Sequence, residues 1–268
     1  MILPRIITAI IGIPVILLVI YAGGFPFFAF ITFVIMMSLY EYSLMMKLAL
    51  KPVDNFSLFL CGILFPVTFY LNGGEYSFIY NFLPFFISLS VILPWFIELF
   101  RKEKYLERVT YTIAGTLFIS FNLSFLILLR DLKPYGRNMV FSIIICVWIM
   151  DTAAYFVGSK FGKNKLNDIS PKKTIEGFVA GLLTALIFYY FAAGIFKENF
   201  SLKEMLLIGL LVSLAGQFSD LGESLVKRAC GVKDSSNLLP GHGGFLDRFD
   251  SYIFISPIIY YTIIFMGH

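Results

Sequence analysis

The chain has 268 residues, of which 59% are hydrophobic and only 14% charged, with a net charge of +4 and a mean hydropathy of +0.84. A water-exposed globule of this size has too little polar surface to cover so many apolar side chains, among them 31 Phe and 15 Tyr. The composition therefore excludes an ordinary soluble domain and predicts a polytopic membrane protein. The modest charge gives no indication of nucleic-acid binding, and we expect no nucleic-acid partner.

The three cysteines, Cys61, Cys146 and Cys230, are far apart and form no C-x-x-C pair. An odd number without framework spacing argues against a disulfide scaffold and against a zinc site. The apolar run that ends at Tyr21 is similar to a signal peptide, but a second run begins at Phe25. We therefore expect an uncleaved first span.

A membrane-spanning helix needs about 20 mostly apolar residues. Windows of this kind predict an all-α, polytopic integral membrane protein with about nine transmembrane helices. Gly23 and Gly24, with Pro26 nearby, predict a tight turn between the first two. The windows are 6–22, 25–46, 56–72, 77–99, 109–129, 139–159, 175–196, 204–226 and 249–267.

The distribution of Lys and Arg predicts the orientation, because these residues accumulate in cytoplasmic loops. With a cytoplasmic N-terminus, all but five of the 21 Lys and Arg residues fall on the cytoplasmic side. We expect a multi-pass protein of the cytoplasmic (inner) membrane whose polar segments 160–174 and 227–248 face the cytoplasm, where nucleotides are. No linker divides the chain, so 1–268 is expected to be a single membrane-embedded domain, with N-terminal helices in 1–130 and catalytic helices and loops in 139–268.

The segment 217–251 concentrates polar residues between two apolar runs. Within it, Asp220, Ser224, Lys227 and Arg228 recur at helical spacing and share one face. Cations at a helix end can simply reach for lipid headgroups. That explanation does not cover Asp220, which lies further into the apolar run, where an ionisable group costs about 3 kcal/mol. The pattern predicts a functional role for this face.

The loop that follows is rich in glycine, and glycines allow backbone N–H groups to approach an anion closely. A plain turn would explain the same pattern. The residues expected to contact substrate in this loop are Lys233, Asp234, His242, Gly243 and Gly244.

Asp247 and Asp250 open the last span, three residues apart and on one face, although an acid in a first helical turn also complements the helix dipole. Together with Asp220, they indicate a hard cation with oxygen ligands, and Mg²⁺ fits best. Four bases in the same segment complement a polyphosphate. Acids for a metal beside bases for phosphate favour phosphoryl or nucleotidyl transfer. The bases are Lys227, Arg228, Lys233 and Arg248.

A second polar cluster begins where Asp151 interrupts an apolar run, and the basic segment from Lys160 follows it. Thr174 is placed to cap the next helix, and a helix N-terminus beside Lys172 and Lys173 is a credible anion site. Contact with anionic lipid headgroups, at about 1 kcal/mol per cation, would also explain a basic loop. That second explanation applies above all to Lys163 and Lys165.

Together these residues resemble the phosphatidate cytidylyltransferases, also called CDP-diacylglycerol synthases. The segment Ser170 to Gly177, SPKKTIEG, is also similar to that family. The resemblance implies the reaction of CTP with phosphatidate to give CDP-diacylglycerol and pyrophosphate, with Mg²⁺, in phospholipid biosynthesis. The matching pattern runs Ser224, Lys227-Arg228, Lys233-Asp234, His242-Gly243-Gly244, Asp247-Arg248 and Asp250.

On the basis of this resemblance, Asp220 and Asp247 are expected to ligate one Mg²⁺ or a pair of cations, with Asp250 and Asp234 as supporting groups or additional ligands. The expected catalytic residues are Asp220, Asp247, Lys227, Arg228 and Asp250. The expected substrate-binding residues are Ser224, Lys233, Asp234, His242, Gly243, Gly244, Arg248, Lys172, Lys173, Lys160 and Asp151.

Two alternatives stay open. A CTP-dependent polyprenol kinase would transfer the γ-phosphoryl group to an alcohol and release CDP. An ion or phosphate transporter would use Asp151 and Asp220 as a path through the membrane, although the sequence shows no two related halves. The expected partners are CTP, phosphatidate, membrane lipids and a second copy of the chain in a homodimer.

Overall fold

A computed structural model describes residues 3–72, 82–239, 241 and 243–268, with side chains described from Ile10 onward. Within these ranges no β-strand forms, and only two isolated β-bridges occur, Lys165 with Thr174 and Leu239 with Gly243. The all-α prediction is confirmed for this part of the chain. The elements are α1 (Leu3–Ala22), α2 (Gly24–Leu48), α3 (Asn55–Asn72), α4 (Leu83–Leu99), α5 (Leu106–Gly115), the π-helical η2 (Thr116–Phe121), α6 (Asn122–Asp131), α7 (Gly136–Phe161), α8 (Ile175–Phe196), α9 (Leu202–Ala229) and α10 (Leu246–Phe265).

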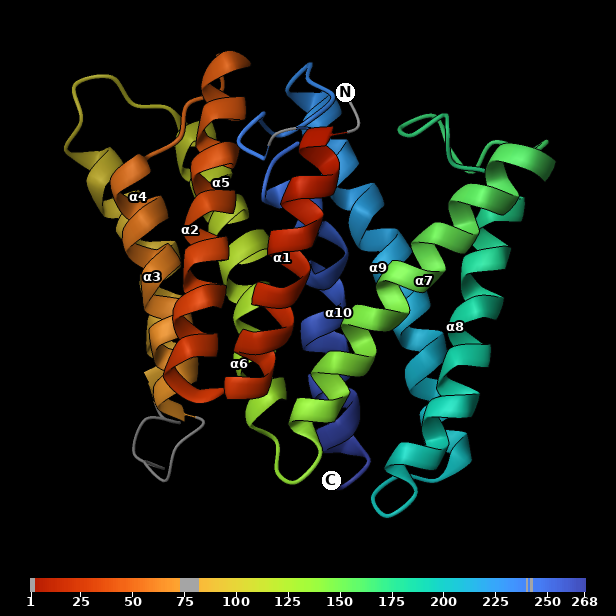
Figure 1. The fold of residues 1–268 in the computed structure, drawn as a ribbon. Coiled ribbons are helices and arrows are strands. Elements are labelled where there is room, and N and C mark those ends of the chain that lie inside the picture. The colour runs from red at the N-terminus through yellow and green to blue at the C-terminus, as the bar shows by residue number, and fades with distance from the viewer. Residues whose placement is uncertain (1–2, 73–81, 240, 242) are drawn as a thin grey trace.

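The helices run along a common direction and alternate up and down through one bundle (Figure 1). The start of α1, the α7–α8 loop and the α9–α10 loop lie at one end, and the C-terminus lies at the other (Figure 1). We call the first the loop end of the bundle. In the C-terminal half, α7 packs on α8, α8 on α9 and α9 on α10, while α6 and α2 also contact α10.

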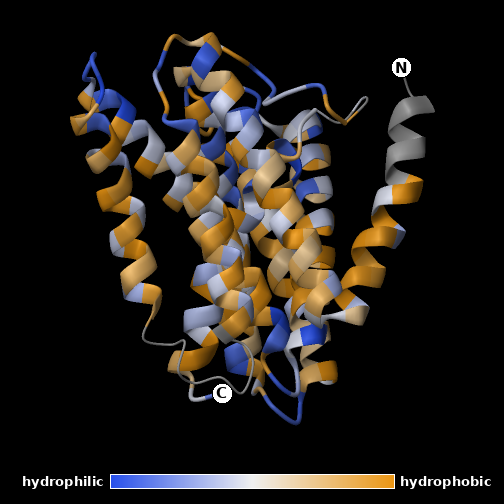
Figure 2. Cartoon of the chain, turned by 90° about the vertical axis from the view of Figure 1, so that its left-hand side faces the viewer, coloured by the Kyte–Doolittle hydropathy of each residue, from blue (hydrophilic) through white to orange (hydrophobic). Residues whose placement is uncertain are grey.

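Five helical segments are long and apolar enough to cross a membrane. They are Gly24–Leu48, Leu106–Asp131, Gly136–Phe161, Ile175–Phe196 and Leu202–Ala229. They coincide with five of the nine predicted windows, so a helical membrane protein is supported. The other four windows fall on α1, α3, α4 and α10; the first residues of the window at 77–99 lie outside the described residues. Hydrophobic residues cover the length of the helices and polar ones gather toward the ends (Figure 2).

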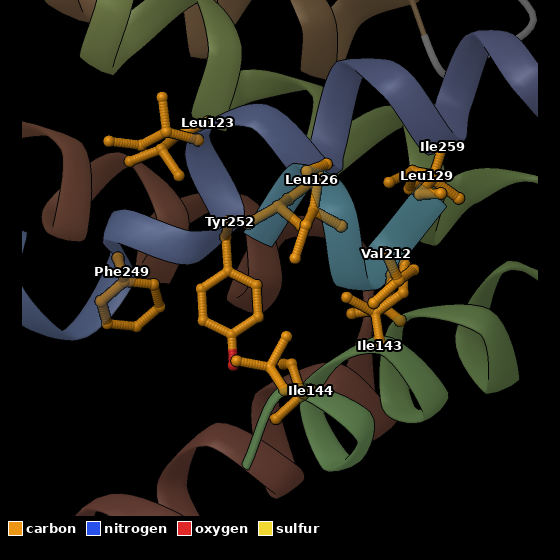
Figure 3. Packing of buried hydrophobic residues seen from close by; sticks show 14 of the residues in the cluster. Leu123, Leu126, Leu129, Ile143, Ile144, Val212, Phe249, Tyr252 and Ile259 are labelled. Atoms are coloured by element: carbon orange, nitrogen blue, oxygen red, sulfur yellow. The ribbon is translucent and has the colours of Figure 1, made fainter. Parts of the chain in front are cut away.

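The main core cluster mixes aliphatic and aromatic side chains from both halves of the chain (Figure 3), and a smaller, mostly aromatic cluster lies beside α3 and α6. Leu123, Leu126 and Leu129 recur every third residue on α6 and meet Tyr252 and other residues of α10. Since lipid tails are as apolar as leucine, packing contacts rather than removal from water hold such helices together. The spacing therefore matters because it lets side chains interlock.

Two local predictions, the turn at Gly23–Gly24 and the helix cap at Thr174, are confirmed by the structure. Gly23 and Gly24 have φ values of 63° and 49°, the left-handed conformation that a turn between two abutting helices needs. Thr174 caps α8 as predicted, since its side chain accepts a hydrogen bond from the Gly177 N–H at 3.1 Å. Ser201 and Glu204 form a capping box at the start of α9.

Small residues bring α7 and α8 close together at the loop end. A Cβ atom on Gly177 would lie 2.7 Å from the Ala154 carbonyl oxygen, and one on Gly158 would lie 2.9 Å from the Thr174 hydroxyl. Close approach of backbones through glycine is a common way for membrane helices to associate. This contact sets the position of the α7–α8 loop.

Gly177→Ala should therefore lower the thermal unfolding midpoint in detergent, because the added methyl group forces α8 away from α7 at a cost of about 1–3 kcal/mol. Gly194→Ala, in the same helix, is the matched control, since no atom lies within 4 Å of a Cβ at that site. The control should be neutral or gain up to about 1 kcal/mol from helix propensity. A Gly177→Ala midpoint equal to that of the control would contradict the close contact.

Candidate active site

A cavity of about 570 Å³ lies between α7, α8, α9 and α10 at the loop end. This volume is in the range of small-molecule sites, about 300–1,000 Å³. It brings together the two polar clusters that are more than 40 residues apart in the sequence. Seven site residues predicted from the sequence line this cavity: Asp151, Lys172, Lys173, Asp220, Asp247, Arg248 and Asp250.

The two clusters are in direct contact across this cavity. The Lys173 ammonium lies 2.5 Å from Asp220 Oδ2, and both side chains are about 30% exposed, at 28% and 32%. An ion pair as exposed as this adds about 1 kcal/mol or less to stability. Its significance is positional, because a cation from the α7–α8 loop and an acid from α9 face the same space.

The α7–α8 loop is folded back on itself as a short hairpin. Leu166 N donates to Lys173 O at 2.8 Å, and Ile175 N donates to Asn164 O at 3.0 Å. Asn164 is held in turn by the Glu176 carboxylate, to which its Nδ2 donates at 2.9 Å. These bonds hold Lys172 and Lys173 at the N-terminus of α8, where backbone N–H groups and the helix dipole also favour an anion.

Lys227 does not line the cavity but lies behind it, where it bridges acids from two helices. Its Nζ lies 2.6 Å from Glu223 Oε2 on the same helix and 2.7 Å from Asp247 Oδ1 on α10. All three side chains are largely buried, with exposed fractions of 11%, 0% and 7%. A buried cation shared by two carboxylates offsets the desolvation of all three groups and ties α9 to α10.

The glycine-rich loop wraps around Asp247. Asp247 Oδ2 accepts hydrogen bonds from Ser235 N at 2.9 Å, Ser235 Oγ at 2.8 Å and Gly244 N at 2.8 Å. Gly243 has φ +81°, and a Cβ there would lie 2.7 Å from Asp247 Oδ2. Gly243 and Gly244 thus let the loop approach a protein carboxylate, and their contact with substrate stays a prediction.

Three carboxylates form a cluster that could hold a metal ion: Asp220, Glu223 and Asp250 each offer an oxygen within 4.8 Å of the others. Neither Glu223 oxygen has a hydrogen-bond partner among the described residues, although the Lys227 ammonium is near one of them. Oxygen-only ligands with unsatisfied lone pairs fit a hard divalent cation such as Mg²⁺.

This grouping differs from the predicted pair of Asp220 and Asp247. Asp247 lines the same cavity, but both of its oxygens already accept hydrogen bonds from protein donors. Sequence reasoning did not assign a role to Glu223. Its position, three residues after Asp220 and four before Lys227, puts it on the same helix face and could have identified it.

Some predicted site residues do not line the cavity. Arg228 instead donates to the Val232 carbonyl at 2.8 Å and the Ile169 carbonyl at 3.4 Å, which joins the two loops. His242 lies outside the described residues. Six other described residues that were predicted to bind substrate are also absent from the lining. Ser224 is buried, Lys160, Lys233 and Asp234 are exposed, and the other two are Gly243 and Gly244.

The cavity also has polar walls that the sequence did not single out as a site. Ser159 and Ser170 line it near the α7–α8 loop, and Gln217 lines it one turn before Asp220. Gln217 Nε2 donates to Ser213 Oγ at 3.0 Å and to the Phe178 carbonyl at 3.3 Å, which orients its amide. Ser170 begins the SPKKTIEG segment noted in the sequence, whereas only the cavity identifies Ser159 and Gln217 as lining residues.

Comparisons with known proteins match nearly the full length of the chain. The sequence profile of the family described as "Cytidylyltransferase family" matches residues 3–266. The phosphatidate cytidylyltransferase of Bacillus subtilis is 33% identical over 264 residues, covering 97% of this chain and 96% of that protein. The enzyme of the same name from Synechocystis is 30% identical over 291 residues with the same coverage. That from Staphylococcus haemolyticus is 32% identical over 259 residues, covering 95% and 96%.

A match of this extent does not depend on the C-terminal motifs alone, because it includes the N-terminal helices, in which no motif was recognised. The resemblance noted in the sequence is confirmed, and the chain belongs to the cytidylyltransferase family.

Proposed function

We propose that this protein transfers the cytidylyl group of CTP to phosphatidate, giving CDP-diacylglycerol and pyrophosphate. The observation that carries the proposal is the single cavity in which Lys172 and Lys173 face Asp220 and Asp250. Its polar lining suits two phosphate-bearing substrates, and the apolar helices around it suit a lipid. The relatives named phosphatidate cytidylyltransferase support the choice of reaction.

This reaction does not need a strong general base, because the attacking phosphate is already ionised. A phosphate oxygen of phosphatidate, largely ionised near neutral pH, attacks the α-phosphorus of CTP. The bond from that phosphorus to the oxygen bridging to the β-phosphorus breaks, and pyrophosphate leaves. The protein must therefore align two anions and screen their repulsion. Lys173, Lys172 and Arg248 supply positive charge around the cavity, and the N-terminus of α8 adds backbone N–H donors.

In this proposal Asp220, Glu223 and Asp250 would hold Mg²⁺, and the bound ion would neutralise charge on the phosphate groups. Their clustered oxygens support the assignment, and so does the buried Glu223 carboxylate, which has an ion pair with Lys227 but no hydrogen-bond donor among the described residues. The ligand role of Asp247 stays a prediction. Lys227 keeps Glu223 and Asp247 in place from behind the cavity.

The proposal also includes nine membrane spans, with the N-terminus and the loop end in the cytoplasm. Four of the five long apolar segments follow one another from Leu106 to Ala229, and shorter apolar helices precede them. The loops that carry most of the Lys and Arg gather at one end of the bundle (Figure 1). This orientation gives the cavity access to CTP. A homodimer stays a prediction.

Purified protein in detergent, given labelled CTP, phosphatidate and Mg²⁺, should release pyrophosphate and form CDP-diacylglycerol. Release of CDP would instead indicate the polyprenol kinase, and no turnover without sealed vesicles would favour a transporter. Removal of Mg²⁺ with a chelator should abolish the reaction.

Asp220→Asn serves as the control for that assay. Since it removes one charge from the proposed metal site, its turnover at saturating Mg²⁺ should fall below about one tenth of wild type. Higher residual turnover would remove Asp220 from the metal role.

Lys173→Gln should lower kcat/KM for CTP by about 10- to 100-fold, the effect of losing a charged hydrogen bond. Lys163→Gln is the matched control, because Lys163 is an exposed lysine of the same loop that does not line the cavity. The control should stay within about twofold of wild type. Equal losses for both variants would show that the loop attracts lipid or nucleotide only through its total charge.

Single cysteines test the orientation. The native Cys61, Cys146 and Cys230 are buried, so they contribute little background to labelling by a membrane-impermeant maleimide. Glu103→Cys, between α4 and α5, should react only when the cytoplasmic side is accessible. Glu198→Cys, between α8 and α9, should react only from the opposite side. Labelling of both positions from one side would contradict the proposed topology.

A further inference from the structure

Glu41 is a fully buried carboxylate on α2, far in sequence from the candidate active site. It lies in the N-terminal half, which carries no recognised motif. Among the described residues, four donors reach its carboxylate, and all belong to the α9–α10 loop and the start of α10. They are Ser236 Oγ at 2.7 Å, Leu246 N at 2.8 Å, Phe245 N at 2.9 Å and Ser235 Oγ at 2.9 Å.

An acid with 0% exposure on an apolar helix is costly unless its charge is compensated. Among the described residues no Lys or Arg forms an ion pair with Glu41, so the loop donors provide the compensation. Hydrogen bonds to charged groups are stronger than neutral ones. The loop is thus held to α2 by the acid, and the acid is solvated by the loop.

The contact also caps α10. The helix has no side-chain cap of its own at Phe245, and the Phe245 and Leu246 N–H groups are among those that a helix leaves unpaired at its start. The Glu41 carboxylate accepts hydrogen bonds from both N–H groups, so a residue of α2 caps the N-terminus of α10. Asp247 and Asp250, which line the cavity, follow within the next turn and a half.

Ser235 connects Glu41 to the active-site acids. Its hydroxyl lies 2.9 Å from Glu41 Oε2 and 2.8 Å from Asp247 Oδ2, and its one proton can be donated to only one of them at a time. A methyl group on Gly244 would overlap both Ser235 Oγ and the Glu41 carboxylate. The glycine is therefore required for this approach as well as for the wrapping of Asp247.

We propose that Glu41 is a positioning residue for the reaction: it holds the α9–α10 loop and the first turn of α10 so that Asp247, Arg248 and Asp250 point into the cavity. The expected effect on the reaction rate rests on the proposed function, whereas the expected effect on the α9–α10 loop does not. Among the described residues, none of the hydrogen-bond donors to Glu41 lines the cavity, so Glu41 acts through Ser235 and the α10 backbone.

Glu41→Gln tests the proposal with almost no change in shape. The amide turns an NH₂ group toward donors, which breaks at least one hydrogen bond and removes the charge. We expect kcat to fall by about 10- to 100-fold, the cost of a displacement near 1 Å, while KM for CTP changes little. Amide hydrogen exchange should speed up in 235–247 and stay unchanged in Leu106–Asp131.

Ser38→Ala is the matched control. Ser38 is buried one turn earlier on α2, and its hydroxyl has no hydrogen-bond partner among the described residues. This variant should keep wild-type kcat and exchange. Ser236→Ala removes one of the four donors and should give a smaller loss than Glu41→Gln.

Glu41→Gln with wild-type kcat and unchanged exchange in 235–247 would overturn the proposal. Faster exchange spread evenly over all helices would also overturn it, because Glu41 would then stabilise the bundle in general. If the wild-type protein forms no CDP-diacylglycerol, the proposed function fails, whereas the exchange experiment still decides whether Glu41 holds the loop.

Discussion

Carboxylates inside an apolar helical bundle must find cations or hydrogen-bond donors within the protein, because neither lipid nor a dry core can solvate them. In this chain that requirement links distant parts of the sequence. Glu41 and Asp247 share the hydroxyl of Ser235, and Lys227 joins Asp247 to Glu223. A chain of contacts thus runs from α2 through the α9–α10 loop to α10 and α9. The position of each element at the loop end depends on the others.

The same network divides the acids into two groups by the donors around them. Asp247 accepts hydrogen bonds from protein donors at both of its oxygens. Asp220, Glu223 and Asp250 cluster with oxygens left over for a cation. In the sequence these four residues are all simply acidic, and only the hydrogen-bond donors around each carboxylate in the structure distinguish them. Family membership alone therefore does not say which carboxylate meets a metal.

Much of the fold follows from local pattern. Apolar length identified the five spanning segments, the Gly23–Gly24 pair identified a turn, and Thr174 was recognised as a helix cap. The site was predicted as two clusters because acids interrupting apolar runs are conspicuous. Glu223 was missed although its helical spacing was readable. Glu41 could not have been found from the sequence, because an isolated acid in an apolar helix does not reveal its partner two hundred residues away.

By itself the sequence determined that the protein is helical and membrane-embedded, that it carries two polar clusters, and that these resemble a cytidylyltransferase. These properties depend on composition and on the spacing of residues within one helix or loop, and both can be taken directly from the sequence. Only the tertiary structure decided that Lys173 meets Asp220, that Asp247 is wrapped by its own loop, and that α2 caps α10. Those contacts depend on how helices pack, since burial and close approach of backbones arise between segments and not within them.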